Sequence, residues 1–541
     1  MKKLLSKRYV CALFLAFSAV LTALTLVYPD IGILQWVSLV PAGTVILTKA
    51  TDPTVKLRHM YLLGLQFFVF YFCTVYSWII SMYPLDFTGF SKPLALLLIL
   101  LAWLGLSLLF SLSYAFSFVL IAYYARGKIT ARHPIALLFI FAGLWVVFEW
   151  MQTLHWTGVP WGRLCLGQVG VSYTLQSASL FGSYFVTFLI VAVNMLLAYA
   201  VTERRAMRLC SVIAALVFVS DLLLGIALRF NTLSQLEDSA ETVEVAVIQG
   251  NISVYEKWDY PSSVTKPIEI HGELTRQAAE QGARIVIWSE TTLPYSLVEF
   301  PKTEARLCDI ATKYGVTLVT GIFTDVYNED SEPVFYNSVI AMDSEGNLDD
   351  TVYHKQHLVP FGEYVPHRDV ILNLFPFLGD ISMLSYDLTP GTEASIFDLD
   401  GVKAGAIICF DSIYESSTIE STRNGAQFIM MATNESWFDG SRAMSMHNDQ
   451  AKLRAIECGR FIARSANTGI SAIISPIGES MCEVDALESG FCVYSIPISD
   501  EPQITLYTRI GNLFVYLNIA ALIGLIVTNA ALKIYNRIKK Q

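Results

Sequence analysis

Eight long apolar runs constrain this chain more than any other feature of its sequence. A helix needs about 20 apolar residues to cross the hydrocarbon core of a bilayer, and each run is close to that length or longer. The fourth run is overlong, and we interpret it as one tilted or extended span rather than two. The runs lie near residues 10–28, 31–48, 60–82, 94–124, 134–151, 182–202, 208–229 and 511–533.

The low share of charged residues indicates that part of the chain lies in lipid and part in water. Charged residues make up 16% of the chain, whereas soluble proteins carry about a quarter, so part of this protein must be surrounded by lipid. The deficit is confined to the apolar runs. We therefore predict a seven-span membrane domain over residues 1–235, a soluble domain over 236–508, and an eighth span with a basic tail over 509–541.

The N-terminal sequence MKKLLSKRYVCALFLAFSAV has the basic start and apolar run of a signal peptide. We expect a retained first helix instead, because the apolar stretch continues to Tyr28 and no small-x-small cleavage motif follows cleanly. Further apolar runs also come immediately afterwards, which is typical of a multi-span protein.

Basic residues alternate between the short loops that join the apolar runs. They cluster before the first run and after the second, fourth, sixth and eighth, whereas the other short loops hold only Lys92 and Arg163. Because Lys and Arg are enriched in cytoplasmic loops, we expect both termini in the cytoplasm and residues 236–508 outside it. In a bacterium, that side is the periplasmic face of the inner membrane.

Residues 236–508 alternate short β-branched runs with helical stretches. This alternation predicts an α/β domain, and the hairpin-type turn in SVIAMDSEGN indicates a layered sandwich rather than a purely parallel sheet. The predicted strands are VEVAVIQGN (243–251), RIVIWSE (284–290), VTLVTGIF (316–323), SVIAMDSEGN (338–347), VKAGAIICF (402–410), QFIMMATN (427–434) and TGISAIISPIG (468–478). The predicted helices are HGELTRQAAEQG (271–282), TEARLCDIATKYG (303–315) and AKLRAIECGRFIARSA (451–466).

Three chemically active residues stand at or near the ends of predicted strands. Glu290 closes RIVIWSE, Lys355 lies in TVYHKQHLVPFGE, and Cys409 closes VKAGAIIC. Strand ends in α/β sheets point side chains into a shared crevice, so the three could converge. Taken singly, each has an ordinary interpretation as a buried cysteine, a solvated lysine or a helix-capping glutamate. Together they fit thiol chemistry, since a carboxylate can accept the proton of the thiol and an ammonium can stabilise the thiolate and an oxyanion.

Other kinds of site receive less support from the sequence. The histidines of the soluble region do not stand at the ends of apolar strands, which disfavours a histidine-based cysteine site; they are His271, His354, His357, His367 and His447. The nine cysteines contain no CxxC pair, so neither a zinc site nor a disulfide framework is indicated, and we expect no cofactor. Whether Cys308, Cys458, Cys482 or Cys492 pair in an oxidising compartment stays open. A net charge of −10 without a basic stripe argues against nucleic acid.

At this point the sequence resembles the carbon–nitrogen hydrolase (nitrilase) superfamily, whose α-β-β-α sandwich carries a Glu–Lys–Cys triad. The flanking residues and the spans narrow the resemblance to the apolipoprotein N-acyltransferase family, in which the soluble domain is inserted between spans seven and eight. The matching segments are QGNISVYEKW (249–258), IVIWSETTLP (285–294), YHKQHLVPFGEYVP (353–366), AIICFDSIYE (406–415), NESWFDG (434–440), RSANTG (464–469) and GVPW (158–161).

The resemblance implies an acyl transfer in two steps. An acyl chain would move from the sn-1 position of a phospholipid to the cysteine as a thioester, and then to the α-amino group of a diacylglyceryl-cysteine in an apolipoprotein. Cys409 would be the nucleophile, Glu290 the general base and Lys355 the stabiliser of the oxyanion. Glu363 would support proton transfer or the lysine. We expect the enzyme to be a monomer.

Further expectations concern residues around this triad. Phe410 and Asp411 stand where the family usually has Tyr and then Glu, which puts the choice of acyl donor and the rate of the second step in doubt. Trp258 and Trp437 are candidates for contact with lipid, with ordinary packing as the alternative. The apolar segment 371–391 is expected to be a membrane-dipping lid or else a buried loop.

Two other functions stay open at this stage. One is a membrane-tethered nitrilase-type amidase that hydrolyses a small amide, because a triad alone does not separate transfer from hydrolysis. The other is a transporter or a lipoprotein-binding module with an inactive domain. Transport would favour charges paired inside the spans, and Glu149 is the exception in spans that are otherwise nearly free of them.

Overall fold

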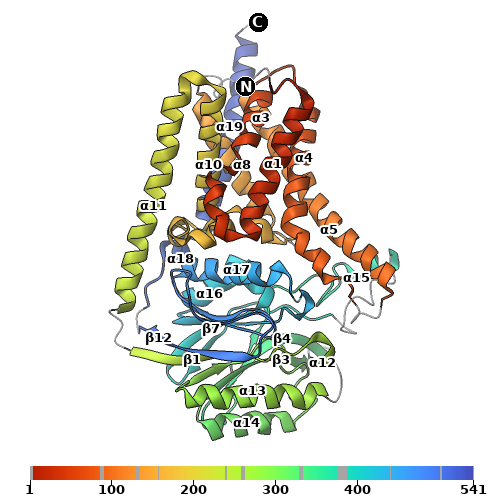
Figure 1. Cartoon of the computed structure of the whole chain (residues 1–541), viewed down its shortest axis with the longest axis vertical. Coiled ribbons are helices and arrows are strands. Elements are labelled where there is room, and N and C mark those ends of the chain that lie inside the picture. The colour runs from red at the N-terminus through yellow and green to blue at the C-terminus, as the bar shows by residue number, and fades with distance from the viewer. Residues whose placement is uncertain are drawn as a thin grey trace. The chain divides into compact units, whose positions relative to one another are not determined.

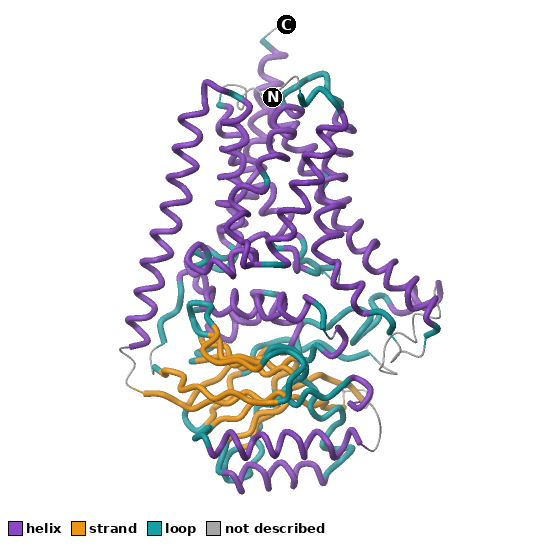
Figure 2. Tube along the Cα trace, viewed as in Figure 1, coloured by secondary structure: helices purple, strands orange, loops and turns teal. Residues whose placement is uncertain are grey.

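The computed structural model describes residues 4–85, 90–127, 133–155, 157–237, 241–257, 262–327, 333–374, 387–438, 440–499 and 502–539. The chain forms two units, each assembled from segments that are distant in the sequence (Figure 1). The helical unit comprises Met1–Ile80, Ile99–Phe230 and Ile510–Gln541, and the mixed unit comprises Ser81–Leu98 and Asn231–Arg509. The strands, orange in Figure 2, all belong to the mixed unit.

Within the described residues, eight helical stretches are long and apolar enough to cross a membrane, which confirms the predicted number of spans. The overlong fourth run is one stretch, interrupted only at Ala115, where α5 (Lys92–Tyr114) gives way to α6 (Phe116–Ala125). The others are α1 (Arg8–Val27), η1 to α3 (Pro29–Ala50), α4 to η2 (Leu57–Met82), α8 (Pro134–Met151), α10 (Ser183–Thr202), η6 with α11 (Arg204–Glu237), and most of α19 (Leu513–Ile538).

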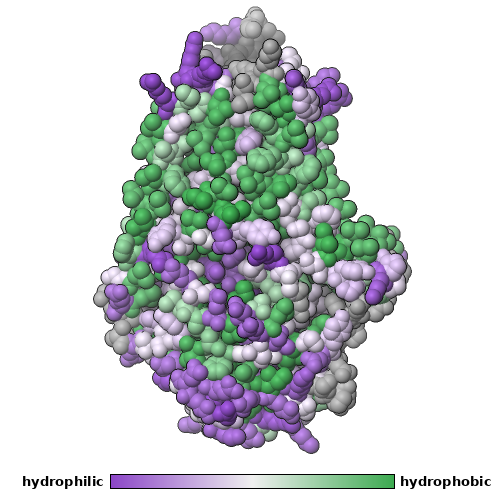
Figure 3. Space-filling model, in the orientation of Figure 1, coloured by the Kyte–Doolittle hydropathy of each residue, from purple (hydrophilic) through white to green (hydrophobic). Residues whose placement is uncertain are grey.

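Several of these helices expose apolar side chains that a soluble protein would bury. Leu101 of α5 and Leu216 and Leu223 of α11 are each about three-fifths exposed. In Figure 3 the helices carry a broad surface of apolar residues, drawn in green. Exposed apolar surface of this extent is stable when lipid rather than water covers it, so the protein is a membrane protein.

The connection between the fifth and sixth spans is folded into the helical unit. Its 3-10 turns η4 (Pro160–Gly162) and η5 (Leu164–Thr174) are largely buried. Glu149 of α8 connects the start of η5 to α10, because its carboxylate accepts hydrogen bonds from the Leu164 backbone N–H at 2.7 Å and from Thr187 at 2.9 Å. Asp221 of α11 is a second buried acid among the spans and accepts from Ser177 at 2.7 Å. Both acids therefore have polar partners inside the protein.

The mixed unit contains two six-stranded sheets. The first has the order β12 (Gly490–Ile498), β1 (Glu241–Gln249), β2 (Ile285–Ile287), β3 (Thr317–Tyr327), β4 (Pro333–Met342) and β5 (Tyr353–His354). The second has the order β11 (Ser480–Val484), β10 (Ser471–Ile474), β9 (Phe461–Ala466), β8 (Phe428–Thr433), β7 (Val402–Ile408) and β6 (Ile396–Leu399). Each sheet mixes parallel and antiparallel pairs, as the predicted hairpins required.

The two sheets pack face to face, and helices cover their outer faces. Alternate residues of the strands, such as Val247 of β1 and Ile408 of β7, form one core between the sheets. The other face of the first sheet packs on α13 (Ser262–Glu280) and α14 (Lys302–Tyr314), and that of the second on α17 (Arg442–Cys458). The predicted α-β-β-α sandwich is therefore confirmed. Alternation along the strands makes this possible, because successive side chains point to opposite faces.

The prediction of one helix over residues 451–466 is wrong in its second half. Helix α17 ends at Cys458, and Gly459 follows in the left-handed conformation with a φ of +62°. Glycine adopts this conformation without steric cost and commonly terminates a helix. The residues after it, FIARSA, form the buried strand β9 between β8 and β10.

Truncation of the core between the sheets provides a test of the sandwich. We expect Val247→Ala, at a position with no solvent exposure, to lower the free energy of unfolding by roughly 2 kcal/mol through lost burial. Val326→Ala, the same change at a half-exposed position near the end of β3, should have little effect. Thermal unfolding of the detergent-purified protein, followed by circular dichroism, compares the two. Equal midpoints would contradict the packing.

Candidate active site

The predicted triad lies in the mixed unit, at the points where three strands end. Glu290 comes shortly after β2, Lys355 directly after β5, and Cys409 directly after β7 at the start of η8 (Cys409–Ile413). The Lys355 Nζ donates a hydrogen bond to Glu290 Oε1 at 3.0 Å, and both side chains are almost fully buried. The turn that begins at Cys409 lies against the lysine segment, since the Tyr353 hydroxyl donates a hydrogen bond to Asp411 at 2.8 Å. The three residues therefore lie together.

A second carboxylate completes the surroundings of Lys355. Glu363, from the loop after β5, lies 3.0 Å from the Lys355 Nζ. Asn337 of β4 bridges the two acids, since its side-chain N–H group donates to Glu290 at 2.8 Å and to Glu363 at 2.9 Å. The backbone N–H of Val359 also donates to Glu363, at 2.8 Å. One ammonium and two carboxyl groups thus share a single buried cluster, which we call the acid–lysine cluster.

Burial and charge act in opposite directions on this cluster. Burial disfavours the charged form of Lys355, but the facing carboxylates of Glu290 and Glu363 outweigh it and hold the pKa of the ammonium above its usual value. Burial raises the pKa of Glu363; Lys355 opposes this change, and the neighbouring Glu290 adds to it. Lys355 is therefore the fixed positive charge, and the carboxyl groups of Glu290 and Glu363 both face it.

The Cys409 thiol has a pKa raised above its ordinary value. Burial is the largest cause and the carboxylate of Glu290 the next, while Lys355 acts in the opposite direction. The resting side chain is accordingly a thiol rather than a thiolate. Removal of its proton then requires a base in the site. Glu290 is the candidate base, because its carboxylate has the largest effect of any charged group on the pKa of this thiol.

Cys409 also has a strained backbone. Its φ of +46° places a non-glycine residue in the left-handed region, at a cost on the order of 1 kcal/mol or more. Local hydrogen bonds hold this turn. Ser412 donates its hydroxyl hydrogen to the Cys409 carbonyl at 2.8 Å, and His447 Nε2 lies 3.1 Å from the same oxygen. The turn is what directs the residue out of the end of β7.

A buried charged network lies behind His447. Glu435, with no solvent exposure, accepts hydrogen bonds from His447 Nδ1 at 2.7 Å and from the Thr433 hydroxyl at 3.0 Å, and it pairs with the guanidinium of Arg464. This network was not predicted from the sequence. Glu435 and Arg464 do occur in the segments NESWFDG and RSANTG, but their contact with a histidine in the middle of α17 depends on the fold.

Asp411 joins the nucleophile turn to the lysine loop. Its buried carboxylate accepts hydrogen bonds from the Ile408 backbone N–H at 3.0 Å, the Tyr353 hydroxyl at 2.8 Å and the His357 backbone N–H at 2.8 Å. The shorter side chain that replaces the usual glutamate is thus well bonded. Phe410 contacts the Tyr414 ring edge-on, with 5.7 Å between ring centroids.

Lys257 is a further basic residue at the site that the analysis of single residues did not identify. It ends α12 (Val254–Lys257), is almost fully buried, and donates to the backbone carbonyl of Glu290 at 3.0 Å. Burial lowers the pKa of its amine to about 7, although Glu290 and Cys409 act in the opposite direction. Its position within the matching segment QGNISVYEKW could have identified Lys257 as a residue of the site.

The two predicted tryptophans and the predicted lid are described only in part. Trp258 lies outside the described residues, and Trp437 is half-buried in η9 (Ser436–Phe438). Residues 375–386 of the segment 371–391 also lie outside the description. Before them, α15 (Arg368–Leu374) exposes Leu374 by about two-thirds, and Arg368 forms an ion pair with Asp387.

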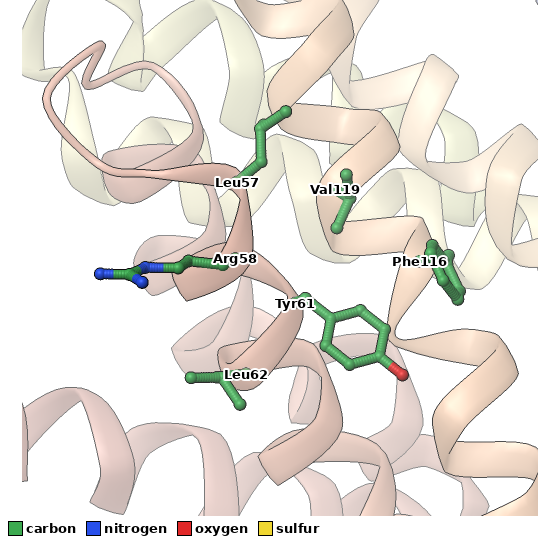
Figure 4. Close-up of a pocket in the computed structure, with 6 residues that line it drawn as sticks. All are labelled: Leu57, Arg58, Tyr61, Leu62, Phe116 and Val119. Carbon is green, nitrogen blue, oxygen red and sulfur yellow. The ribbon is translucent and has the colours of Figure 1, made fainter.

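Other described parts of the structure were searched for a second reactive or metal-binding site. An apolar hollow lies between α4 and α6 in the helical unit (Figure 4), lined by Leu57, Arg58, Tyr61, Leu62, Phe116 and Val119. Its lining contains neither a thiol nor a carboxylate. Among the residues that the structure describes, no group of three or more His, Cys, Asp or Glu side chains is arranged to hold a metal ion.

Neutralising Glu435 should destabilise the mixed unit. We expect Glu435→Gln to lower the free energy of unfolding by roughly 3 kcal/mol, because it leaves the buried guanidinium of Arg464 without its counter-charge. Glu273→Gln is the matched control, since it breaks an exposed pair with Arg276 and should change little. Chemical denaturation followed by tryptophan fluorescence measures both. Equal free energies of unfolding in the two variants would contradict the proposed contribution of this network to stability.

Comparison with known proteins identifies both units. The carbon–nitrogen hydrolase model matches residues 244–504, and the apolipoprotein N-acyltransferase N-terminal domain model matches residues 18–196. An apolipoprotein N-acyltransferase of Geobacter metallireducens is 28% identical over 94% of this chain and 93% of its own length. Those of Allorhizobium ampelinum and Coxiella burnetii are 32% and 30% identical, over 66% and 73% of this chain and 68% and 76% of their own lengths.

Solved structures in the nitrilase superfamily are more distant. An amidase from Nesterenkonia is 17% identical, and the match covers 51% of this chain and 95% of that one, with a TM-score of 0.37.

Proposed function

Because the chain belongs to the apolipoprotein N-acyltransferase family, within the nitrilase superfamily, we propose that it transfers an acyl chain from a membrane phospholipid to apolipoproteins through a Cys409 thioester. The acceptor would be the N-terminal amine of diacylglyceryl-cysteine. The observation that carries this proposal is the buried acid–lysine cluster beside Cys409, with the Lys355 Nζ 3.0 Å from Glu290.

In the first step, the Cys409 sulfur attacks the ester carbonyl of the phospholipid while its proton passes to Glu290. The ammonium of Lys355 stabilises the negative charge that develops on the carbonyl oxygen. The tetrahedral intermediate then breaks the ester C–O bond and leaves a thioester. The departing lysophospholipid alkoxide takes the proton from Glu290, so Glu290 returns to its carboxylate form.

In the second step, the α-amine of the apolipoprotein attacks the thioester carbonyl. Glu290 accepts a proton from the attacking nitrogen, and the same ammonium stabilises the second oxyanion. Cleavage of the C–S bond gives the amide and restores the Cys409 thiol with that proton. A thioester suits this order, because it stores the acyl group in a form that an amine attacks readily.

Glu363 supports these steps through Lys355 in this proposal. Two carboxyl groups contact one ammonium, so the cluster tolerates a proton on either acid while Lys355 keeps its charge. Burial raises the pKa of Glu363, and its carboxyl group contacts the Lys355 ammonium beside Glu290, which acts as the base in this proposal. Asn337 fixes the positions of the two carboxyl groups relative to one another, because it donates a hydrogen bond to each.

We further propose that the mixed unit faces the periplasm and that both termini are cytoplasmic. The alternation of basic loops supports this orientation. Exposed apolar residues of α15, such as Val370 and Leu374, support a segment that meets lipid at 371–391. Trp258 and Trp437 would contact acyl chains. The enzyme would act as a monomer.

Trapping the acyl-enzyme tests the nucleophile. We expect purified enzyme given phospholipid labelled at the sn-1 acyl chain to form a hydroxylamine-sensitive adduct, and Cys409→Ala to abolish both this adduct and acylation of a diacylglyceryl lipopeptide. Cys458→Ala, at a buried cysteine outside the acid–lysine cluster, should retain both. Hydrolysis of a small soluble amide in the absence of lipid, without any lipid-derived thioester, would instead support the amidase alternative.

Neutralising each acid separately tests their roles. We expect Glu290→Gln to slow thioester formation by about 10²–10⁴-fold, the usual contribution of a general base. Glu363→Gln should slow it less, because Lys355 keeps Glu290 as a partner. Single-turnover measurements with labelled phospholipid compare the variants. An equal or larger defect in Glu363→Gln would mean that the roles of the two acids are reversed.

A further inference from the structure

Two cysteines that the acyl transfer does not use lie in contact at the edge of the sandwich. Cys482 is in β11 and Cys492 is in β12, and their sulfur atoms are 2.6 Å apart. Both side chains are partly buried and pack against the core between the sheets. Their contact therefore lies within the sandwich, although neither residue belongs to the acid–lysine cluster.

The two cysteines belong to different sheets. Cys482 faces Ile473 of β10 in the register of the second sheet, and Cys492 faces Val247 of β1 in the register of the first. Strands β11 and β12 each form the outer edge of their sheet. A bond between the sulfurs would therefore join the two sheets at their edges.

We infer that Cys482 and Cys492 form a structural disulfide that staples the two sheets in the extracytoplasmic enzyme. The inference rests on the proposed orientation, because disulfides persist in the periplasm and are reduced in the cytoplasm. The two thiols lose two protons and two electrons as the sulfur–sulfur bond forms. A disulfide donor, a protein or glutathione disulfide, accepts the electrons and is reduced to two thiols.

The proposed disulfide lies beside the turn between β11 and β12, and this turn contacts the end of β1. Residues between β11 and β12 accept two hydrogen bonds from Gln249, through the carbonyls of Asp485 at 2.7 Å and Glu488 at 2.9 Å. Gln249 in turn accepts from Ser471, at the start of β10. The disulfide would thus hold in place the end of β1, from which the chain runs to Lys257.

Thiol counting in the full-length enzyme tests the pairing directly. Membranes are quenched in acid, denatured and alkylated before and after reduction, and the labelled cysteines are identified by mass spectrometry. We expect Cys482 and Cys492 to be protected before reduction and alkylated afterwards, whereas Cys308 and Cys458 should be alkylated in both samples. Alkylation of Cys482 and Cys492 before reduction would overturn the inference.

Thermal stability provides a second measurement. Dithiothreitol should lower the unfolding midpoint of the wild-type enzyme by roughly 5–10 °C, as expected for loss of a structural disulfide. It should not change the midpoint of the variant with both Cys482→Ser and Cys492→Ser. Cys308→Ser, at a partly buried cysteine of α14, should respond to dithiothreitol as the wild type does. An unchanged wild-type midpoint would show that the pair does not staple the sheets.

Two further measurements distinguish a failure of this inference from a failure of the proposed function. Reduced, purified enzyme given glutathione disulfide should form the bond irrespective of the compartment, and failure to do so would overturn the inference on geometric grounds. Thioester formation at Cys409 should stay within about twofold of the wild type in the double serine variant, in line with neutral changes away from a site. Loss of the thioester with the disulfide intact would instead overturn the acyl-transfer proposal alone.

Discussion

The site depends on one interaction, the burial of the Lys355 ammonium between the carboxyl groups of Glu290 and Glu363. An isolated ammonium in the interior of a protein costs several kcal/mol, so this residue has to be paired wherever it is buried. The pairing draws on four segments of the chain, namely β4 with Asn337, the end of β2, β5 and the loop after β5. The order of strands in the first sheet is what brings them together, because β2 to β5 are consecutive neighbours there.

The second sheet contributes the thiol and holds it under strain. A left-handed Cys409 would relax into an ordinary strand end if nothing opposed it. The opposing contacts come from both sides of the turn. Asp411 ties the turn to Tyr353 and His357 of the first sheet and its loop, and His447, backed by Glu435, lies against the Cys409 carbonyl. The strained turn and the buried charges therefore meet within one site, where hydrogen bonds from both sheets hold Cys409 in place.

The sequence predicted most of the fold because its signals were local. Runs of apolar residues long enough for a bilayer, and strands that alternate with helices, are properties of consecutive residues, and the structure confirms both. The helix over 451–466 failed for a local reason as well, since Gly459 marked its end. The Glu435–His447–Arg464 network could not be found in this way, because its members come from β9, α17 and the turn after β8. Nor could the contact of Cys482 with Cys492, which are ten residues apart on edge strands of different sheets.

A membrane domain attached to such a site agrees with the energetics of its proposed substrates. A phospholipid and a diacylglyceryl-cysteine both keep their acyl chains in the bilayer, and moving such a chain into water would cost roughly 0.8 kcal/mol for each CH₂ group. A soluble enzyme would have to offset that cost in full. An enzyme held beside the bilayer needs to admit only the ester or the amine, and the chains can stay largely in apolar surroundings. The raised pKa of Cys409 agrees with the proposed reaction, since the burial that would shield a thioester from water also keeps the resting thiol protonated.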